Sequence, residues 1–359
     1  MTTSTATLRR RIVPIISTHH VNRRPLRLAL LIGIMGALQL MAGVGLAYVV
    51  GFSKIRHAVD RFAWPYVIVV VGALLISFVG YLFTYRSIYD VDDGPGLSPR
   101  QLLAVVTAGF GGFLAHGGSA LDTYAIQGAG AGRREAKVRV SSLAGLEHGI
   151  LGFVGCGAAI AVLALGLSQP PLDFTLPWAI IPVPGLLLAF WLAGRHRDRF
   201  RGYQGWRGSL SVFVDSILLI KQMFCRPRRF GVDLAGMAVF WLGEMLAAWA
   251  GLAMFGFRMN GAQLIVGMAT GMVFTRRTGP LGGAGVLGLV LPLTLWYSGA
   301  PFAVAVVGVF AYRVVSLWLP LPFSIASLPT LRRIGQQRVP GAEGTAEEPS
   351  AEPAMQRGA

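Results

Sequence analysis

The chain has 359 residues, of which 54% are hydrophobic and 13% are charged, and its formal net charge is +16. Ordinary soluble domains carry about 25% charged residues, so this composition excludes that class and predicts an all-α, polytopic integral membrane helix bundle. The basic residues fall mainly in short segments between apolar runs, as in membrane proteins oriented by positive cytoplasmic loops. The charge therefore predicts orientation and attraction to anionic lipid, not binding to nucleic acid.

The first elements in chain order are two uncharged apolar runs, which cover residues 28–50 and 64–85. Each exceeds the roughly 18 apolar residues that mark a membrane span. Residues 1–27 are basic and show no cleavage site of the signal-peptide type, so we expect this segment to be cytoplasmic.

A glycine-rich break interrupts the next apolar stretch, residues 101–121, between Ala108 and Ser119. Irregular backbone cannot face lipid, because each unpaired N–H or C=O group costs several kcal/mol there. Basic residues follow at 133–139 and favour a cytoplasmic position. We therefore predict that 101–121 is a re-entrant hairpin, not a full crossing.

Further spans are predicted at residues 144–167, 176–194 and 231–256. The second of these carries three prolines and should be kinked. Residues 210–224 place apolar side chains at helical spacing with charged ones between them, which predicts an amphipathic helix in the membrane interface.

A second glycine-broken segment covers residues 262–297, and the last span is predicted at about 301–321. Paired broken segments in the two halves of a membrane chain indicate a transport site. With about six full spans, the first break enters from the cytoplasm and the second from outside, as in inverted repeats. The membrane domain would cover 28–333, and the Gly-, Ala-, Glu- and Pro-rich tail 334–359 should be disordered.

One observation and one alternative leave this topology open. Lys54, Arg56 and Arg61 lie in a loop that it places outside, against the positive-inside pattern. In an alternative, residues 262–275 and 280–297 each cross fully, and the basic residues between them are cytoplasmic.

Ionisable side chains inside spans cost at least about 2.5 kcal/mol on insertion scales, so each one requires an explanation. Glu244 lies near the middle of the fifth predicted span and Arg313 within the last. They could form a buried ion pair that fixes helix packing, contact a substrate, or do both. Glu147 and His148 lie at the predicted start of the third span, where their side chains could instead reach the interface.

Arg276 and Arg277 lie inside the second glycine-broken segment. If that segment is re-entrant, two guanidinium groups at its tip suit a phosphate, because arginine stays charged and offers a planar set of donors. If the segment crosses twice, they are surface anchors.

The sequence lacks the usual signatures of soluble enzymes. It has no phosphate-binding Gly-x-x-x-x-Gly-Lys loop, no Gly-x-Ser-x-Gly elbow and no metal-spaced Cys/His cluster. Its two cysteines, Cys156 and Cys225, give no disulfide framework. We expect no cofactor, no metal and no enzymatic activity.

Three motifs in the C-terminal third resemble the flippase-like membrane domain family, the membrane region of lysylphosphatidylglycerol synthases and their stand-alone relatives. They are Gly279-Pro-Leu-Gly-Gly-Ala-Gly-Val, Tyr297-Ser-Gly-Ala-Pro and Ala311-Tyr-Arg-Val-Val-Ser-Leu-Trp-Leu-Pro. Gly117-Gly-Ser-Ala-Leu-Asp and Ser142-Leu-Ala-Gly-Leu-Glu resemble the family's first turn and the helix after it. The similarity covers roughly residues 28–330 and implies a lipid-translocating membrane protein.

The chain also departs from the family pattern. Gly288 stands where the family often has a glutamate, the second turn's proline lies one residue farther from the glycine pair, and the first turn has no proline. No role of the missing acid is carried over. The bifunctional synthases add a large aminoacyltransferase domain, and the few residues after Arg333 are too short for one, so we do not expect this chain to make aminoacylated lipid by itself.

The leading hypothesis is a flippase-type protein of the plasma (inner) membrane, multi-pass with both termini cytoplasmic, that moves an anionic phospholipid or a lipid-linked headgroup. The predicted substrate-binding residues are Arg313, Arg276, Arg277, Glu244, Glu147, His148, Asp122, Gly282, Gly283 and Gly285. One alternative is a non-catalytic membrane partner or scaffold of a glycosyltransferase or other lipid-modifying enzyme, docked on the basic loop 195–207. Another is a membrane-embedded transferase with Glu147 or Glu244 as base, which no accompanying nucleophile or metal supports.

Overall fold

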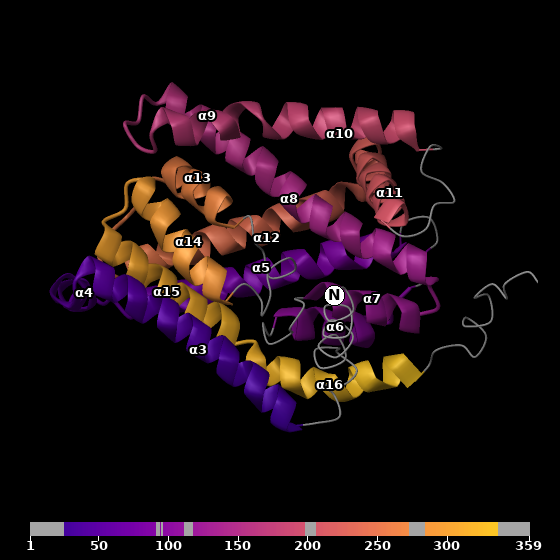
Figure 1. Cartoon of the computed structure of the whole chain (residues 1–359), viewed down its shortest axis with the longest axis horizontal. Coiled ribbons are helices and arrows are strands. Elements are labelled where there is room, and N and C mark those ends of the chain that lie inside the picture. Colours follow the sequence, from indigo (N-terminus) through magenta and orange to yellow (C-terminus); the bar gives the residue numbers. More distant parts are fainter. Residues whose placement is uncertain are drawn as a thin grey trace, which may run out of the picture.

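The computed structural model of the chain describes residues 25–90, 94, 96–110, 118–197, 206–272 and 284–336. These residues form an α-helical bundle, elongated along the direction of its long helices, and they include no strand (Figure 1). Seven helical stretches in the described ranges are long and apolar enough to cross a membrane. The predicted all-α, polytopic helix bundle is therefore confirmed.

The long helices cover the predicted spans, and two of their boundaries, at the start of α8 and at the end of the last span, differ as described below. They are α3 (Pro25–Val50), α5 (Pro65–Asp90), α8 (Arg133–Ala164), α12 (Pro227–Ala253) and α15 (Phe302–Trp318). The proline-rich span consists of α9 (Leu172–Ile180) and α10 (Pro182–His196), which meet at Ile181. Pro182 opens α10, so the predicted kink lies where a proline ring prevents the preceding helix from continuing.

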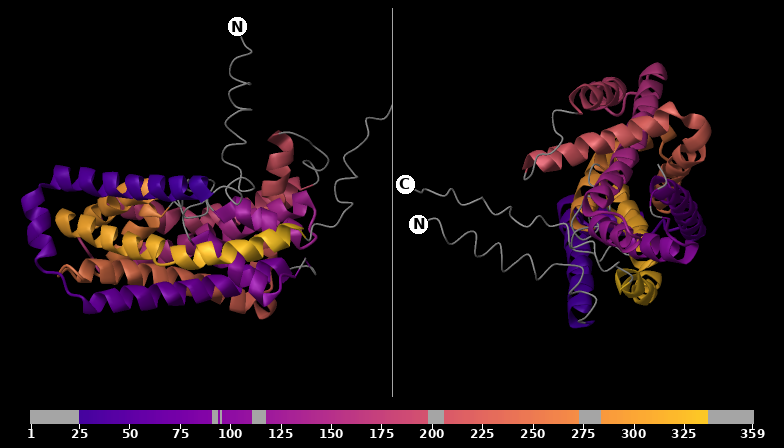
Figure 2. Two further views of the ribbon diagram at one scale, coloured as in Figure 1. Left: turned by 90° about the horizontal axis from the view of Figure 1, so that it is seen from below. Right: turned by 90° about the vertical axis from the view of Figure 1, so that its right-hand side faces the viewer.

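The amphipathic segment forms α11 (Trp206–Cys225), which confirms the predicted helix. Its residues Gly208–Cys225 are apolar enough to count among the seven stretches. However, α11 runs across the direction that α5 and α10 follow (Figures 1 and 2). This orientation agrees with a helix that lies along a membrane surface rather than one that spans it.

Both glycine-broken segments are pairs of short helices. The first pair is α6 (Pro99–Phe110) and α7 (Gly118–Gly128), and the second is α13 (Gly261–Gly271) and α14 (Ala284–Tyr297). At 1.5 Å per residue the longest of the four reaches about 21 Å, which is short of the roughly 30 Å hydrocarbon core.

The second pair is an antiparallel hairpin. A Cβ at Gly267 would lie near Ser298 and Leu295, and one at Gly271 would lie near Thr294 and Leu291. Because later residues of α13 face earlier residues of α14, α14 runs back along α13. The short antiparallel helices agree with the re-entrant prediction, but residues 273–283 lie outside the described residues, so the choice between a re-entrant hairpin and two full crossings stays a prediction.

The two hairpins start from opposite ends of the bundle. At the end that carries α4 (Phe52–Val59), the amide of Ala63 donates to the carbonyl of Met254 at 2.8 Å, and Gln263 Nε2 donates to the carbonyl of Gln169 at 2.8 Å. The second hairpin starts at this end. The first follows α5, which begins beside Ala63 at this end and runs to Asp90 at the other end. The last residue of the first hairpin, Gly128, lies at that other end too, where a Cβ on it would meet Ile334. We call these the α4 end and the basic end.

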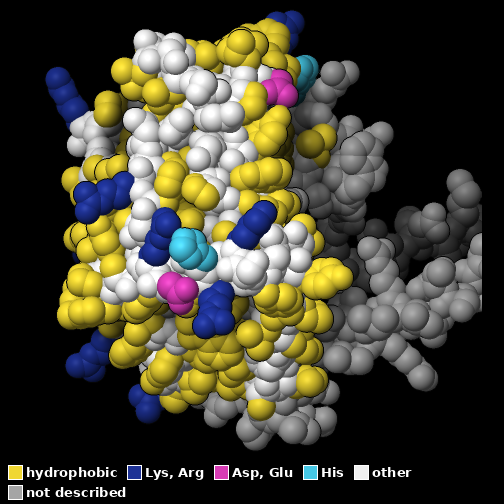
Figure 3. Space-filling model, turned by 90° about the vertical axis from the view of Figure 1, so that its left-hand side faces the viewer, with side chains coloured by type: hydrophobic (Ala, Val, Ile, Leu, Met, Phe, Trp, Pro, Cys, Tyr) yellow, Lys and Arg dark blue, Asp and Glu magenta, His cyan; other side chains and the backbone are white. Residues whose placement is uncertain are grey.

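The α4 end is not free of charge. Its short helix α4 was not predicted, and it carries Lys54, Arg56 and His57, with Asp60 and Arg61 directly after it. Figure 3 shows this face, where charged side chains interrupt a hydrophobic surface. Basic residues therefore lie at the end that the prediction placed outside, against the positive-inside pattern. The orientation of the chain in the membrane stays a prediction.

Close glycine contacts hold the centre of the bundle. α12 packs along α5, and a Cβ at Gly243 would lie 2.5 Å from the carbonyl of Ala73, while one at Gly236 would lie 2.8 Å from the carbonyl of Gly80. Farther along α12, a Cβ at Gly251 would lie 2.7 Å from the carbonyl of Gly308 in α15. Small residues at these crossings let the backbones approach closely, which fixes the polar side chains that α5, α12 and α15 carry.

Two boundaries differ from the prediction. α8 begins at Arg133, not near residue 144, so the basic stretch before the predicted span forms the first turns of the helix. The last span does not end near 321, since α16 (Leu321–Gln336) follows α15 and runs on to the basic end. The tail was predicted to begin at residue 334, but residues 334–336 belong to α16, and the rest of the predicted tail lies outside the described residues.

Candidate functional site

Four of the side chains singled out in the sequence are buried inside the bundle. Asp122 on α7, Glu147 on α8, Glu244 on α12 and Arg313 on α15 have relative exposures of 2%, 3%, 1% and 1%. We call these four the buried charge cluster. Glu147 lies well inside α8 because that helix starts earlier than predicted, so the interpretation that its side chain reaches the interface does not fit.

Glu244 is held from two neighbouring helices. Ser77 Oγ on α5 donates to Glu244 Oε1 at 3.1 Å, and the Tyr312 hydroxyl on α15 donates to Glu244 Oε2. Tyr312 directly precedes Arg313, so the acid and the guanidinium predicted in separate spans lie on contacting helices. Buried carboxyl groups need such donors, because leaving their oxygens without hydrogen bonds in an apolar interior is costly.

Trp241 connects Glu244 to the helix that carries Glu147. Its indole Nε1 donates to the carbonyl of Glu147 at 2.8 Å, and it lies one turn before Glu244 on α12. His148, the next residue on α8, is partly buried, and its Nδ1 lies 2.8 Å from the carbonyl of Ala144 on its own helix. His148 therefore has a local backbone contact, whereas Glu147 belongs to the interior.

Asp122 enters the interior on the second helix of the first hairpin. The Tyr85 hydroxyl on α5 donates to Asp122 Oδ1 at 2.5 Å. Asp122 also lies close enough to Glu147 for their charges to interact. Tyr85 in turn packs against Tyr81 and Tyr89, with ring centroids 6.1 Å and 4.6 Å away. The first hairpin thus brings a carboxyl group against α5, through Tyr85, and near Glu147 on α8.

One buried cation has a structural role that the sequence did not indicate. Arg139 on α8 was interpreted as an orienting charge, but it is 5% exposed. Its Nη1 donates to the carbonyls of Ile88 and Tyr89 at 2.7 and 3.1 Å, and its Nε and Nη2 donate to Glu135 at 2.9 and 2.8 Å. It therefore caps the last carbonyls of α5, where a cation is favoured.

A mainly apolar groove of about 730 Å³ lies between α5, α6, α15 and α16. Leu75 and Phe323 on its wall are exposed at 58% and 64%, so the groove faces the surface that lipid would cover. Arg100 lines it at the start of α6, and Ser316 lines it on α15. Because Ser316 lies one turn after Arg313, the groove reaches the neighbourhood of the buried charge cluster.

The other predicted site residues belong to the second glycine-broken segment. Arg276, Arg277, Gly282 and Gly283 lie outside the described residues, and Gly285 lies in the first turn of α14. The interpretation of the two arginines as a phosphate site therefore stays a prediction. Within the part of the chain that is described, no three His, Cys, Asp or Glu side chains are grouped as metal ligands.

Sequence reasoning missed the partners of the buried acids, namely Ser77, Tyr85, Trp241 and Tyr312. Tyr312 could have been found as the polar neighbour of Arg313 in an apolar span. The other three depend on how α5, α8 and α12 are rotated against each other, which no local pattern reveals.

Comparison of the chain with protein-family models, with curated proteins and with solved structures finds no match. The resemblance to the flippase-like family therefore depends on the motifs in the sequence alone.

Proposed function

We propose that this protein is a lipid translocase-type membrane protein that handles an anionic or lipid-linked headgroup. The observation that carries the proposal is the buried charge cluster. Its four ionisable side chains come from α7, α8, α12 and α15, and none is more than 3% exposed. Charged groups within membrane segments are expensive and mark substrate or ion pathways.

The two hairpins support the same function. Each half of the chain has one long helix, a pair of short helices and another long helix, in the orders α5–α6–α7–α8 and α12–α13–α14–α15. The hairpins start from opposite ends, as expected for inverted repeats, whose substrate sites lie near the bilayer midplane.

The chemistry of the cluster suits a phosphate-bearing headgroup. Arg313 would pair with a phosphate, since a guanidinium forms strong charge-assisted hydrogen bonds with its oxygens. Glu147 and Glu244 would hold that arginine or bind an amine on the headgroup. The groove that Ser316 helps to line would accept the acyl chains, because its wall is apolar and opens to the lipid side.

The test is a headgroup-accessibility assay in liposomes that hold the reconstituted protein and a panel of fluorescent phospholipids. We expect Arg313→Ala to slow translocation by roughly tenfold or more, because hydrogen bonds to charged groups contribute about 1.5–3 kcal/mol. Arg313→Lys keeps the charge and should retain part of the rate. Arg56→Ala, at an exposed arginine of α4, is the matched control and should behave like the parent.

Thermal unfolding of each purified variant separates transport from packing. A cluster that only fixes helix packing predicts lower stability of Arg313→Ala with an unchanged rate per folded molecule. That result, or a panel in which no lipid moves faster than in protein-free vesicles, would refute the proposal.

A further inference from the structure

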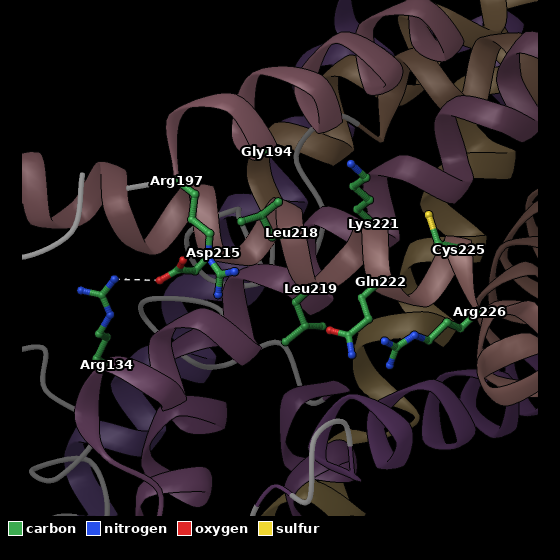
Figure 4. A pocket seen from close by; sticks show the side chains of 10 residues that line it. All are labelled: Arg134, Gly194, Arg197, Asp215, Leu218, Leu219, Lys221, Gln222, Cys225 and Arg226. Atoms are coloured by element: carbon green, nitrogen blue, oxygen red, sulfur yellow. Dashed lines mark hydrogen bonds and ion pairs between the residues drawn. The ribbon is translucent and has the colours of Figure 1, made fainter. Parts of the chain in front are cut away.

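A second charged site lies at the basic end, away from the buried charge cluster. It is a pocket of about 800 Å³ between the start of α8, the end of α10 and one side of α11, within the size range of ligand sites. Figure 4 shows its side chains along α11, with Arg134 reaching Asp215 across from α8. The charged residues that line it are Arg134, Arg197, Asp215, Lys221 and Arg226.

The cations of this pocket outnumber its acids. Arg134 Nη2 forms a salt bridge with Asp215 Oδ2 at 2.7 Å and also donates to Ser211 Oγ. This pairing satisfies the pocket's carboxylate. No salt bridge joins Arg197, Lys221 or Arg226 to a described acid, although they line the same hollow from α10, α11 and the α11–α12 junction. Like charges held together in this way repel each other and attract a multivalent anion.

The surroundings place the pocket where apolar and basic surfaces meet. On α10, Leu188 and Trp191 are 54% and 55% exposed, and the basic residues begin one turn later. Arg195 lies over the Trp191 ring at 5.4 Å. Exposed Trp and basic residues in this order are typical of the headgroup level of a membrane, and the crosswise helix α11 lies at the same level.

We propose that this pocket binds a phosphate group, and that its position favours the phosphate of an anionic lipid headgroup as the source. Arginine binds phosphate through paired donors and lysine binds it as a point charge. A phosphomonoester carries more charge than a phosphodiester and should be preferred. This site does not depend on translocation, because it shares no residue with the buried charge cluster.

The chain provides its own probe for this proposal. Cys225 lines the pocket and is exposed, whereas Cys156, the other cysteine in the sequence, is buried. The alkylation rate of Cys225 by a fluorescent maleimide would be measured on the full chain in nanodiscs. The three conditions are phosphatidylcholine alone, phosphatidylcholine with phosphatidic acid, and phosphatidylcholine with soluble pyrophosphate.

We expect phosphatidic acid to slow alkylation of Cys225. Slowing by the lipid only assigns the pocket to a headgroup, and slowing by pyrophosphate as well assigns it to phosphate groups in general, so both support the proposal. Arg226→Gln and Lys221→Gln should each weaken protection, raising the half-protecting concentration roughly tenfold. The ratio of rates with and without ligand is compared, because the substitutions also change the charge beside the thiol.

Arg228→Gln is the matched control, since Arg228 is exposed two residues beyond Arg226 and does not line the pocket. It should leave protection unchanged. The proposal is overturned if neither phosphatidic acid nor pyrophosphate slows alkylation, or if Arg228→Gln weakens protection as much as Arg226→Gln does.

Discussion

The two hairpins enter the bundle from opposite ends, yet different contacts hold them in place. The second hairpin packs on itself, since a Cβ at Gly271 in α13 would lie 2.6 Å from Leu291 Cδ1 in α14. The first hairpin is held by α16. Ser324 Oγ donates to the carbonyl of Thr107 in α6 at 2.7 Å, and a Cβ at Gly128 in α7 would lie 2.6 Å from Ile334 Cγ2.

The hairpins also differ in chemistry. The first carries Asp122 into the interior, where Tyr85 binds it. The described helices of the second, α13 and α14, contain no Asp, Glu, Lys, Arg or His. Inverted topology therefore does not imply equivalent roles. The described helices of the second hairpin form an apolar wall, whereas a helix of the first hairpin carries a carboxyl group into the interior and contacts a separate helix, α16.

The largest expected effect tests whether the two hairpins start from opposite sides of the membrane. Each introduced thiol should be labelled completely from one side and not at all from the other. Gly96→Cys and Gly261→Cys place a thiol just before each hairpin, and a Cβ at either position meets no described atom within 4 Å. In a Cys225→Ser background, an impermeant maleimide should label each variant from one side of sealed vesicles only, and the two sides should be opposite.

Cys156 is buried and stays as an unlabelled internal control in both variants. Labelling of both introduced thiols from the same side would contradict the inverted arrangement of the hairpins. The proposal of translocation would then lose its main topological support.

Removing the contact of α16 with the first hairpin should have the next largest effect. Ile334 is 1% exposed, so Ile334→Ala should cost about 2–5 kcal/mol of stability. Because α16 holds only the first hairpin, hydrogen exchange should increase in α6 and α7 and stay unchanged in α13 and α14. Ile325→Ala is the control on the same helix, since Ile325 is 39% exposed. Equal increases in both hairpins would contradict the comparison.

Much of the fold could be predicted because the signals are local. Span length and apolar composition predicted α3, α5 and α12, and the glycine clusters predicted where two apolar segments break. These features are local because backbone N–H and C=O groups in the hydrocarbon core must form hydrogen bonds within their own segment. A kink at prolines, as between α9 and α10, is equally local.

The errors came from features that depend on distant partners. The basic stretch at 133–139 was interpreted only as a cytoplasmic segment before a span that starts near 144, but it forms the first turns of α8, and its Arg139 caps α5. α16 was missed because Pro322, Pro329 and several polar residues weaken its apolar pattern, although it packs along the first hairpin.

The site was predictable to the same extent as the fold. The costly residues Glu244 and Arg313 could be recognised one by one, because charge in an apolar span is a local signal. The contacts of Ser77 and Tyr312 with Glu244 could not be predicted in this way. They depend on how each helix is rotated about its own axis, which close contacts such as that between Gly243 and Ala73 determine.

The smallest expected effect concerns packing within the second hairpin. Gly271→Ala introduces a Cβ 2.6 Å from Leu291 Cδ1 and 3.1 Å from Leu291 Cα, so side chain and backbone must both shift. Overpacking of this kind typically costs about 1–3 kcal/mol, and exchange should increase in α13 and α14 but not in α6 and α7. Gly261→Ala, on the same helix but in open space, should leave the thermal midpoint nearly unchanged. If the two variants unfold at the same temperature, the second hairpin is not held by its own glycine contacts, and the contrast with the first hairpin fails.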